Sequence, residues 1–123
     1  MEIRKLIRGS LQPDNGLLAH RLLPWTELNA PFEGAWCVIK PGTSSNAHSH
    51  HEYEIFIAMS GSATLESDGK RSEFNAGDVA YFKPGQDHQV INDTDFDFQM
   101  YGVWWDAEMT ERFVARHEGG QAR

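Results

Sequence analysis

Four side chains that suit a divalent metal ion lie in two short segments of the sequence. His48, His50 and Glu54 share one parity along the first segment, and residues two apart in a strand project from the same face. His88 follows the turn sequence Pro84-Gly85 and begins a second strand-like stretch, so a neighbouring strand can present it to the same ion. Imidazole nitrogens and a carboxylate oxygen are ligands for divalent first-row metals. We therefore predict one metal site with four protein ligands.

The donor set indicates an open site. Three histidines and one carboxylate leave positions free on a six-coordinate ion, whereas a closed structural zinc site more often uses thiolates. Free positions admit water, dioxygen or a chelating substrate, which favours a catalytic or ligand-binding site over a purely structural one. The ligand types do not choose among zinc, iron, manganese and nickel.

Turn sequences divide the chain into short strand-like stretches, which is typical of a sandwich or barrel. Asp68-Gly69, between two such stretches, is a strong two-residue hairpin signal. The predicted strands are Ala35–Lys40, Glu54–Met59, Ala63–Ser67, Lys70–Phe74, Val79–Phe82, His88–Ile91 and Phe96–Trp105. The sequence therefore predicts an all-β fold.

One helix is expected after the last strand, with Asp106 as its N-cap. We predict a single domain over residues 1–117, because 123 residues suit one hydrophobic core. Residues 118–123, which include Gly119-Gly120, are expected to form a loose tail or a linker.

Composition excludes several classes of partner. The net charge of −7 and the absence of a basic stripe exclude nucleic acid and anionic membrane surfaces as expected partners. Cys37 is the only cysteine, so no internal disulfide forms, and we expect a cytoplasmic protein with a buried, inert thiol. The strand Glu54–Met59 is apolar on both faces after its first residue. Its second apolar face needs cover from another sheet or from a second subunit, so a homodimer stays open.

The two ligand segments resemble the two motifs of the cupin superfamily. The first is glycine, five residues, His-x-His, three residues, Glu, six residues, glycine, and it is matched by Gly42, His48, His50, Glu54 and Gly61. The second is matched by Gly77, Gly85, His88 and Asn92. One departure is Lys83, which stands where the family has proline, with Pro84 beside it. The resemblance implies a cupin β-barrel, a jelly roll or double-stranded β-helix, with a short C-terminal helix.

A narrower likeness concerns the runs 54–61 and 98–106. They are similar to small bacterial cupins that are fused to, or paired with, a methionyl-tRNA-synthetase-like protein. In that family the pair is a hydrazine synthetase: the partner esterifies an amino acid to a hydroxylated lysine, and the cupin rearranges the ester to form an N–N bond with a bound metal. This likeness implies a synthetase-like partner and an amino-acid-derived substrate.

Two functions remain open at this stage. As an enzyme, the chain would use the metal as a Lewis acid or dioxygen binder on a small polar substrate, in an aromatic cavity; a non-haem iron dioxygenase is one form of this. As a binding module, it would hold metal and ligand without turnover. On the last strand, Gln99 and Tyr101 share one face and are the candidate catalytic residues that would orient a substrate.

Overall fold

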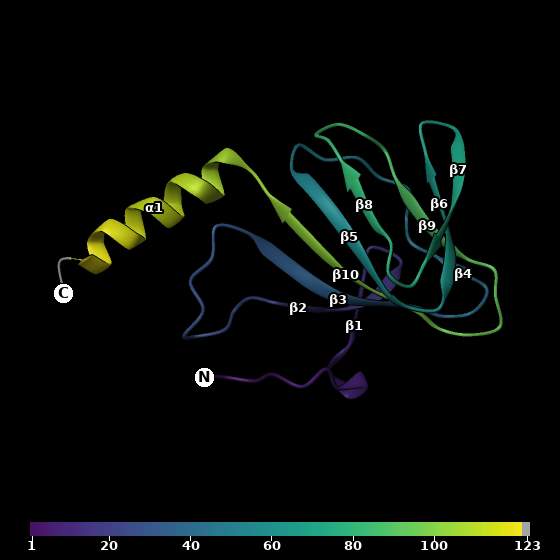
Figure 1. Ribbon diagram of the computed structural model, residues 1–123, viewed down its shortest axis with the longest axis horizontal. Coiled ribbons are helices and arrows are strands. Elements are labelled where there is room, and N and C mark those ends of the chain that lie inside the picture. The colour runs from purple at the N-terminus through teal and green to yellow at the C-terminus, as the bar shows by residue number, and fades with distance from the viewer. Residues whose placement is uncertain (122–123) are drawn as a thin grey trace.

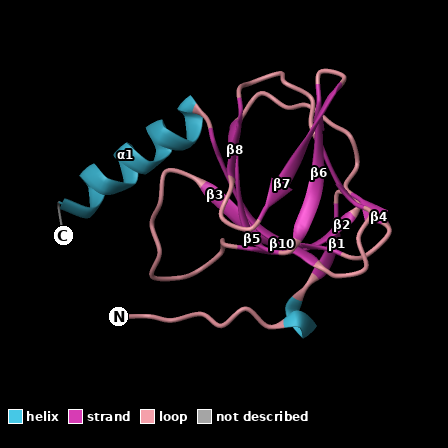
Figure 2. Ribbon diagram, turned by 45° about the vertical axis from the view of Figure 1, so that its right-hand side comes forward, coloured by secondary structure: helices cyan, strands magenta, loops and turns pink. Residues whose placement is uncertain are grey.

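Two sheets that face each other make up most of the molecule (Figure 1 and Figure 2) in the computed structural model, which describes residues 1–121. The elements are η1 (Arg8–Ser10), β1 (Gln12–Asp14), β2 (Leu17–Arg21), β3 (Glu33–Ile39), β4 (Thr43–Ser44), β5 (Tyr53–Ser60), β6 (Ser62–Ser67), β7 (Lys70–Asn75), β8 (Val79–Phe82), β9 (Gln89–Asn92), β10 (Phe98–Trp105) and α1 (Ala107–Gln121). One sheet has the order β1-β2-β3-β10-β5-β8, and the other has the order β4-β9-β6-β7. The predicted all-β, cupin-type architecture is confirmed.

Tight hairpins join neighbouring strands where the sequence provides residues that tolerate positive φ. Asp68-Gly69 connects β6 to β7 with φ of 53° and 76°, as predicted. Asn15-Gly16 connects β1 to β2 in the same way, with φ of 55° and 82°. Two central residues with φ above zero are what the type I′ hairpin turn requires. The strands β1, β2 and β4 were not predicted, whereas the other seven overlap the predicted stretches.

Strand β10 lies at the centre of the larger sheet, between β3 and β5. Its inner face carries Phe98, Met100 and Gly102, which are buried. The side chains between them face outward, as alternation along a strand requires. Trp104 pairs in register with Glu54, and Phe98 pairs with Ile39. Trp104 is six positions after Phe98 along the strand, so the two lie roughly 20 Å apart, at opposite ends of the barrel.

The Phe98 end of the barrel is solidly packed. Phe98, Ile39 and Val90 are at most 1% exposed, and the rings of Phe74 and Phe98 lie 5.7 Å apart between centroids. Phe98, Phe74, Ile39 and Val90 belong to one buried hydrophobic cluster to which both sheets contribute. It anchors the sheets so that the other end can remain open.

Two residues of the cupin-like motifs have structural roles at the packed end. Gly61 has φ of +84°, and a Cβ there would lie 2.6 Å from the carbonyl oxygen of Asp97, so only glycine fits. Asn92 is 1% exposed. Its amide donates to the carbonyl oxygens of Ile39 and Phe96, and its side-chain oxygen accepts from Thr94. Asn92 thus fixes the loop between β9 and β10.

Helix α1 leaves the barrel from the end of β10 and projects away from it (Figure 1). Asp106 caps it as predicted, accepting from the backbone N–H of Met109 at 2.7 Å. The helix continues to Gln121, and residues 122–123 of the predicted tail lie outside the described residues. The domain boundary after residue 117 stays a prediction. None of the described helices has the length and apolar character that a membrane crossing needs.

The outer face of β5 is only partly covered in a single chain. Ile57 is 37% exposed and Met59 is 40% exposed, and Val79 and Tyr81 of the edge strand β8 are exposed beside them. The inner face of β5 is buried. The second sheet therefore covers the inner face of β5. A second subunit that would cover the outer face, in a homodimer, stays a proposal.

Candidate metal centre

The four predicted ligands converge at one point. His48, His50, Glu54 and His88 each offer one ligand atom, and these atoms all lie within 4.8 Å of one another. His50 and His48 belong to the segment before β5, Glu54 is in β5, and His88 lies just before β9. A backbone bridge joins the two segments: the N–H of His88 donates to the carbonyl of His48 at 3.0 Å, and the reverse bond is 3.3 Å.

The backbone orients all three imidazoles in the same way. Nδ1 of His48 lies 3.0 Å from the carbonyl oxygen of Asn46, Nδ1 of His50 lies 3.2 Å from that of Glu52, and Nδ1 of His88 lies 3.0 Å from that of Gln86. A carbonyl accepts only, so these contacts suit the tautomer with the proton on Nδ1, in which each Nε2 would offer its lone pair to a bound ion. Such second partners fix the tautomer and the ring direction of metal-binding histidines.

Glu54 lies at the centre of the cluster and is buried. Its Oε1 is 3.0 Å from Nε2 of His50 and 2.9 Å from Nε2 of His88. The ring of His88 stacks on Phe82 with centroids 4.3 Å apart. A carboxylate that converges with imidazole nitrogens in a site of low polarity is what a divalent ion would neutralise and hold.

The donor set fits one first-row ion. Metal–nitrogen and metal–oxygen bonds of about 2.0–2.2 Å place two donors on opposite sides of an ion roughly 4.2 Å apart. The spread of 4.8 Å is close to that value. Because no Nε2 is occupied by a carbonyl partner, the four residues would hold an ion with small side-chain adjustments.

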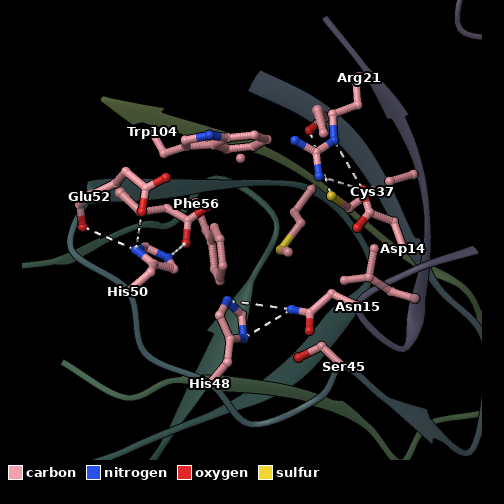
Figure 3. A pocket seen from close by; sticks show the side chains of 16 residues that line it. Asp14, Asn15, Arg21, Cys37, Ser45, His48, His50, Glu52, Phe56 and Trp104 are labelled. Atoms are coloured by element: carbon pink, nitrogen blue, oxygen red, sulfur yellow. Dashed lines mark hydrogen bonds and ion pairs between the residues drawn. The ribbon is translucent and has the colours of Figure 1, made fainter. Parts of the chain in front are cut away.

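A cavity of about 260 Å³ opens beside the cluster. Figure 3 shows His50 and Glu52 on one side of it, Arg21 and Asp14 on the other, and Trp104 along one edge. Small side chains of the larger sheet give the cavity its depth, and they are Ala19, Ala35, Cys37 and Gly102. The volume is below the 300–1,000 Å³ that is usual for drug-sized ligands, so the cavity suits a small molecule.

The hairpin β1–β2 supplies a wall of the cavity that the sequence analysis missed. Asp14, Asn15 and Arg21 all line the cavity. The amide nitrogen of Asn15 lies 2.9 Å from Nδ1 and 3.4 Å from Nε2 of His48, so this turn reaches the cluster itself. The dipeptide Asn15-Gly16 is a strong hairpin signal, and it could have indicated that a further pair of strands precedes the first motif.

The two candidate catalytic residues on β10 lie on the other face of the strand. Gln99 accepts a hydrogen bond from the indole of Trp36 at 3.0 Å, and Tyr101 packs near Gly34. Neither lines the cavity, whereas their neighbours Met100 and Gly102 do. Burial raises the pKa of the Tyr101 phenol. The structure therefore gives no support to their predicted role in orienting a substrate: alternation along β10 points Met100, Gly102 and Trp104 inward instead.

Three further groups near the site have shifted pKa values. Burial raises the pKa of the Cys37 thiol to about 12, and the charge of Glu54 adds to the shift. His51, next to the ligands, is exposed and lies 2.8 Å from Asp106. The hydrogen bond with Asp106 raises the pKa of His51. The pKa of Asp106 is lowered, mainly by the hydrogen bond from the backbone N–H of Met109 and less by the hydrogen bond from His51.

A double-stranded β-helix with a three-histidine, one-glutamate cluster at its open end defines a class of metal-binding barrels. The family described as "Cupin domain" matches residues 35–105. The chain belongs to the cupin family.

Solved structures of two bacterial proteins are similar over nearly the whole chain. A Cupin 2 conserved barrel domain protein from Salinispora arenicola CNS-205 is 62% identical, with a TM-score of 0.92 over 95% of this chain and 98% of that one. The plu4264 protein from Photorhabdus luminescens is 41% identical, with a TM-score of 0.91 over 94% of this chain and 97% of that one.

A curated relative from Thermotoga maritima is named "Oxalate-binding protein". It is 33% identical over 66 residues, which is 53% of this chain. The match spans about half of the relative's own length, 54%.

Proposed function

We propose that this chain is a metal-dependent cupin enzyme that acts on a small polar substrate, an amino-acid derivative, in the cavity beside the cluster. The convergence of His48, His50, Glu54 and His88 within 4.8 Å carries the proposal. When bound there, a divalent ion supplies Lewis-acid polarisation of a substrate oxygen or nitrogen. The ion would be zinc, iron, manganese or nickel.

The chain's own residues would prepare the site for that chemistry. The three Nδ1–carbonyl contacts orient the rings, so that the Nε2 atoms would face a bound ion. The apolar groups of Phe56, Met100 and Trp104 line the cavity and would exclude water from a bound ligand. Asn15 and Arg21 of the hairpin β1–β2 line the cavity together with His48 and His50, so a ligand held there would lie beside the ion.

A second candidate is binding without turnover. One observation favours it: among the described residues that line the cavity, the carboxylates and imidazoles are either in the metal cluster or already beside a partner. Asp14 pairs with Arg21, and Glu52 lies beside His50 and His51. The name of the Thermotoga maritima relative states binding for that protein. A ligand-binding sensor or accessory protein would need no general base.

Metal analysis of the protein purified without added metal tests the site. We expect one ion per chain in the wild type and none in His50→Ala. His51→Ala is the matched control, because His51 is exposed and turned toward Asp106, and it should keep the ion. Full-affinity binding in His50→Ala would refute the ligand assignment.

Turnover assays then separate the two candidates. Bound iron with substrate-dependent oxygen consumption would support a dioxygenase. Bound zinc without oxygen chemistry would support the narrower proposal of a rearrangement that forms an N–N bond, for which a synthetase-like partner protein would supply the ester substrate. A metal-loaded chain that binds such substrates and returns them unchanged would favour the sensor.

A further inference from the structure

The cavity wall opposite the metal cluster carries a charged pair that the metal chemistry does not use. Arg21, at the end of β2, lies with its Nη2 3.0 Å and its Nε 3.1 Å from the same oxygen, Oδ2 of Asp14. The guanidinium also lies over the ring of Trp104, at 5.0 Å from the centroid. Both charged side chains line the cavity. The pair is therefore held in place at the cavity by a third side chain.

The pair keeps hydrogen-bonding capacity that faces a ligand. Within the described residues, Asp14 is the one hydrogen-bonding partner of the Arg21 side chain, so Nη1 donates to no protein group in that part of the chain. Asp14 uses Oδ2 for both contacts, and Oδ1 has no protein donor among the described residues. A guanidinium donor suits a carboxylate, and a carboxylate oxygen suits an ammonium group.

The charges around the cavity favour a ligand with both signs. Three carboxylates line it, Asp14, Glu52 and Glu54, and Arg21 is the single guanidinium among the described lining residues. With a divalent ion on the cluster the formal charges cancel. A ligand with two negative charges would place one of them away from the ion, where Asp14 and Glu52 repel it. In a ligand that also carries an ammonium group, the positive charge offsets that repulsion.

From these observations we propose that Arg21 and Asp14, backed by Trp104, form a subsite for the head group of an α-amino acid, with the carboxylate on Arg21 and the ammonium on Asp14. The remainder of the ligand would extend toward the metal cluster across the cavity. The inference deepens the proposed function, on which it rests, by naming the residues that recognise the two charges of the substrate's head group.

Three small probes of similar length separate the contributions. L-Glutamate carries the complete head group and a side-chain carboxylate for the ion, glutarate lacks the ammonium, and 4-aminobutyrate lacks the α-carboxylate. Each is titrated calorimetrically into the full-length chain loaded with zinc, whose metal content is measured before and after. We expect L-glutamate to bind at least about tenfold more tightly than either analogue, because each analogue loses one charge-assisted contact.

Two variants assign the contacts to their residues. In Arg21→Gln the preference for L-glutamate over 4-aminobutyrate should disappear while the preference over glutarate remains. In Asp14→Asn the reverse is expected. Arg71→Gln is the matched control, since Arg71 forms a similar ion pair with Glu66 on the hairpin β6–β7, outside the cavity, and it should keep both preferences. A merely structural role for the Arg21–Asp14 pair would weaken all three probes equally.

The failure of this inference differs from the failure of the proposed function. Equal binding of the three probes, absence of binding, or tighter binding of glutarate by a chain that retains its zinc would overturn the amino-acid subsite and leave the metal site intact. A wild-type chain that takes up no metal would instead overturn the proposed function. The wild-type ranking needs no variant, so a variant that folds poorly does not prevent the test.

Discussion

The two ends of the barrel are built from the same strands but are filled differently. Where β10 begins, Phe98 lies against Phe74 and Ile39, and no side chain of this group is more than 2% exposed. Where β10 ends, small residues such as Ala35 and Gly102 leave a cavity, and charged groups stand around it beside the apolar side chains of Phe56 and Trp104. The difference indicates that one end supplies the free energy of folding and the other is free to hold ligands.

The largest expected effect on stability comes from removing a large side chain at the packed end of the barrel. Phe98→Ala should lower the free energy of unfolding by about 3–5 kcal/mol, because it leaves a cavity among fully buried neighbours. Urea denaturation measures this loss. Phe98→Leu, a milder change, keeps a folded protein for metal analysis, and it should bind one ion as the wild type does. Loss of metal in the leucine variant would contradict the separation of the two ends.

A slightly smaller effect concerns Cys37, which lies between the two ends. Its pKa of about 12, against 9.0 for an unperturbed thiol, leaves about a thousandfold less thiolate near pH 8, and the thiolate is the reactive form. A disulfide reagent should therefore modify the folded protein far more slowly than the urea-unfolded protein. Because the pKa is raised, the rate should keep increasing with pH above 9. Rapid labelling at pH 8 would show that the cavity floor is open to solvent.

Metal should stabilise the protein through its open end. At a free metal concentration about 100 times the dissociation constant, one site adds about 2.7 kcal/mol to the free energy of unfolding. Thermal or urea denaturation with and without zinc measures the increment, which should be absent in Glu54→Gln if that carboxylate is a ligand. An equal increment in this variant would place the ion elsewhere.

The smallest expected change in stability follows from filling the cavity. A Cβ at Gly102 would lie 3.6 Å from ring atoms of Phe56 and 3.7 Å from Oε2 of Glu54, which are ordinary contacts. Gly102→Ala should therefore change the free energy of unfolding by less than about 1 kcal/mol, because glycine in a strand interior gives little packing. It should weaken the binding of a ligand that reaches the cavity floor. A large loss of stability would show that the open end also contributes to folding.

The ligand set was predictable from the sequence because metal chemistry restricts both residue type and spacing. His48, His50 and Glu54 converge as their spacing predicted. Residues 49–52 lie outside the strands, however, so alternation along one strand does not by itself account for their common direction. The hairpin at Asp68-Gly69 and the cap at Asp106 were predictable because each depends on neighbouring residues alone. Local rules are therefore sufficient for turns, caps and the spacing of ligands.

The inward face of β10 was not predictable in the same way. Gln99 and Tyr101 alternate with Met100 and Gly102, and alternation defines two faces without saying which one meets the core. That choice is set by the pairing of Trp104 with Glu54 across the sheet, which is a long-range fact. The pairing of β10 with β5 also shifts in register between Gln99 and Met100. Counting residues along the sequence therefore does not give the pairing partners at the start of β10.

The hairpin β1–β2 was missed for a related reason. Gln12–Asp14 contains a proline and is polar, so it lacks the alternation of a half-buried strand. It is a strand because β2 pairs with it, and β2 in turn pairs with β3. The placement of Asp14 and Arg21 at the cavity depends on that chain of pairings, which no local pattern encodes.

The position of this hairpin has a consequence for how proteins of this kind diverge. Residues 35–105, which match the family, contain the four candidate metal ligands, whereas Asp14, Asn15 and Arg21 precede them. A change in three residues at a terminal hairpin can therefore alter ligand preference while both signature motifs stay intact. Relatives that share every metal ligand need not share a substrate, and their preferences should be compared at this upstream turn first.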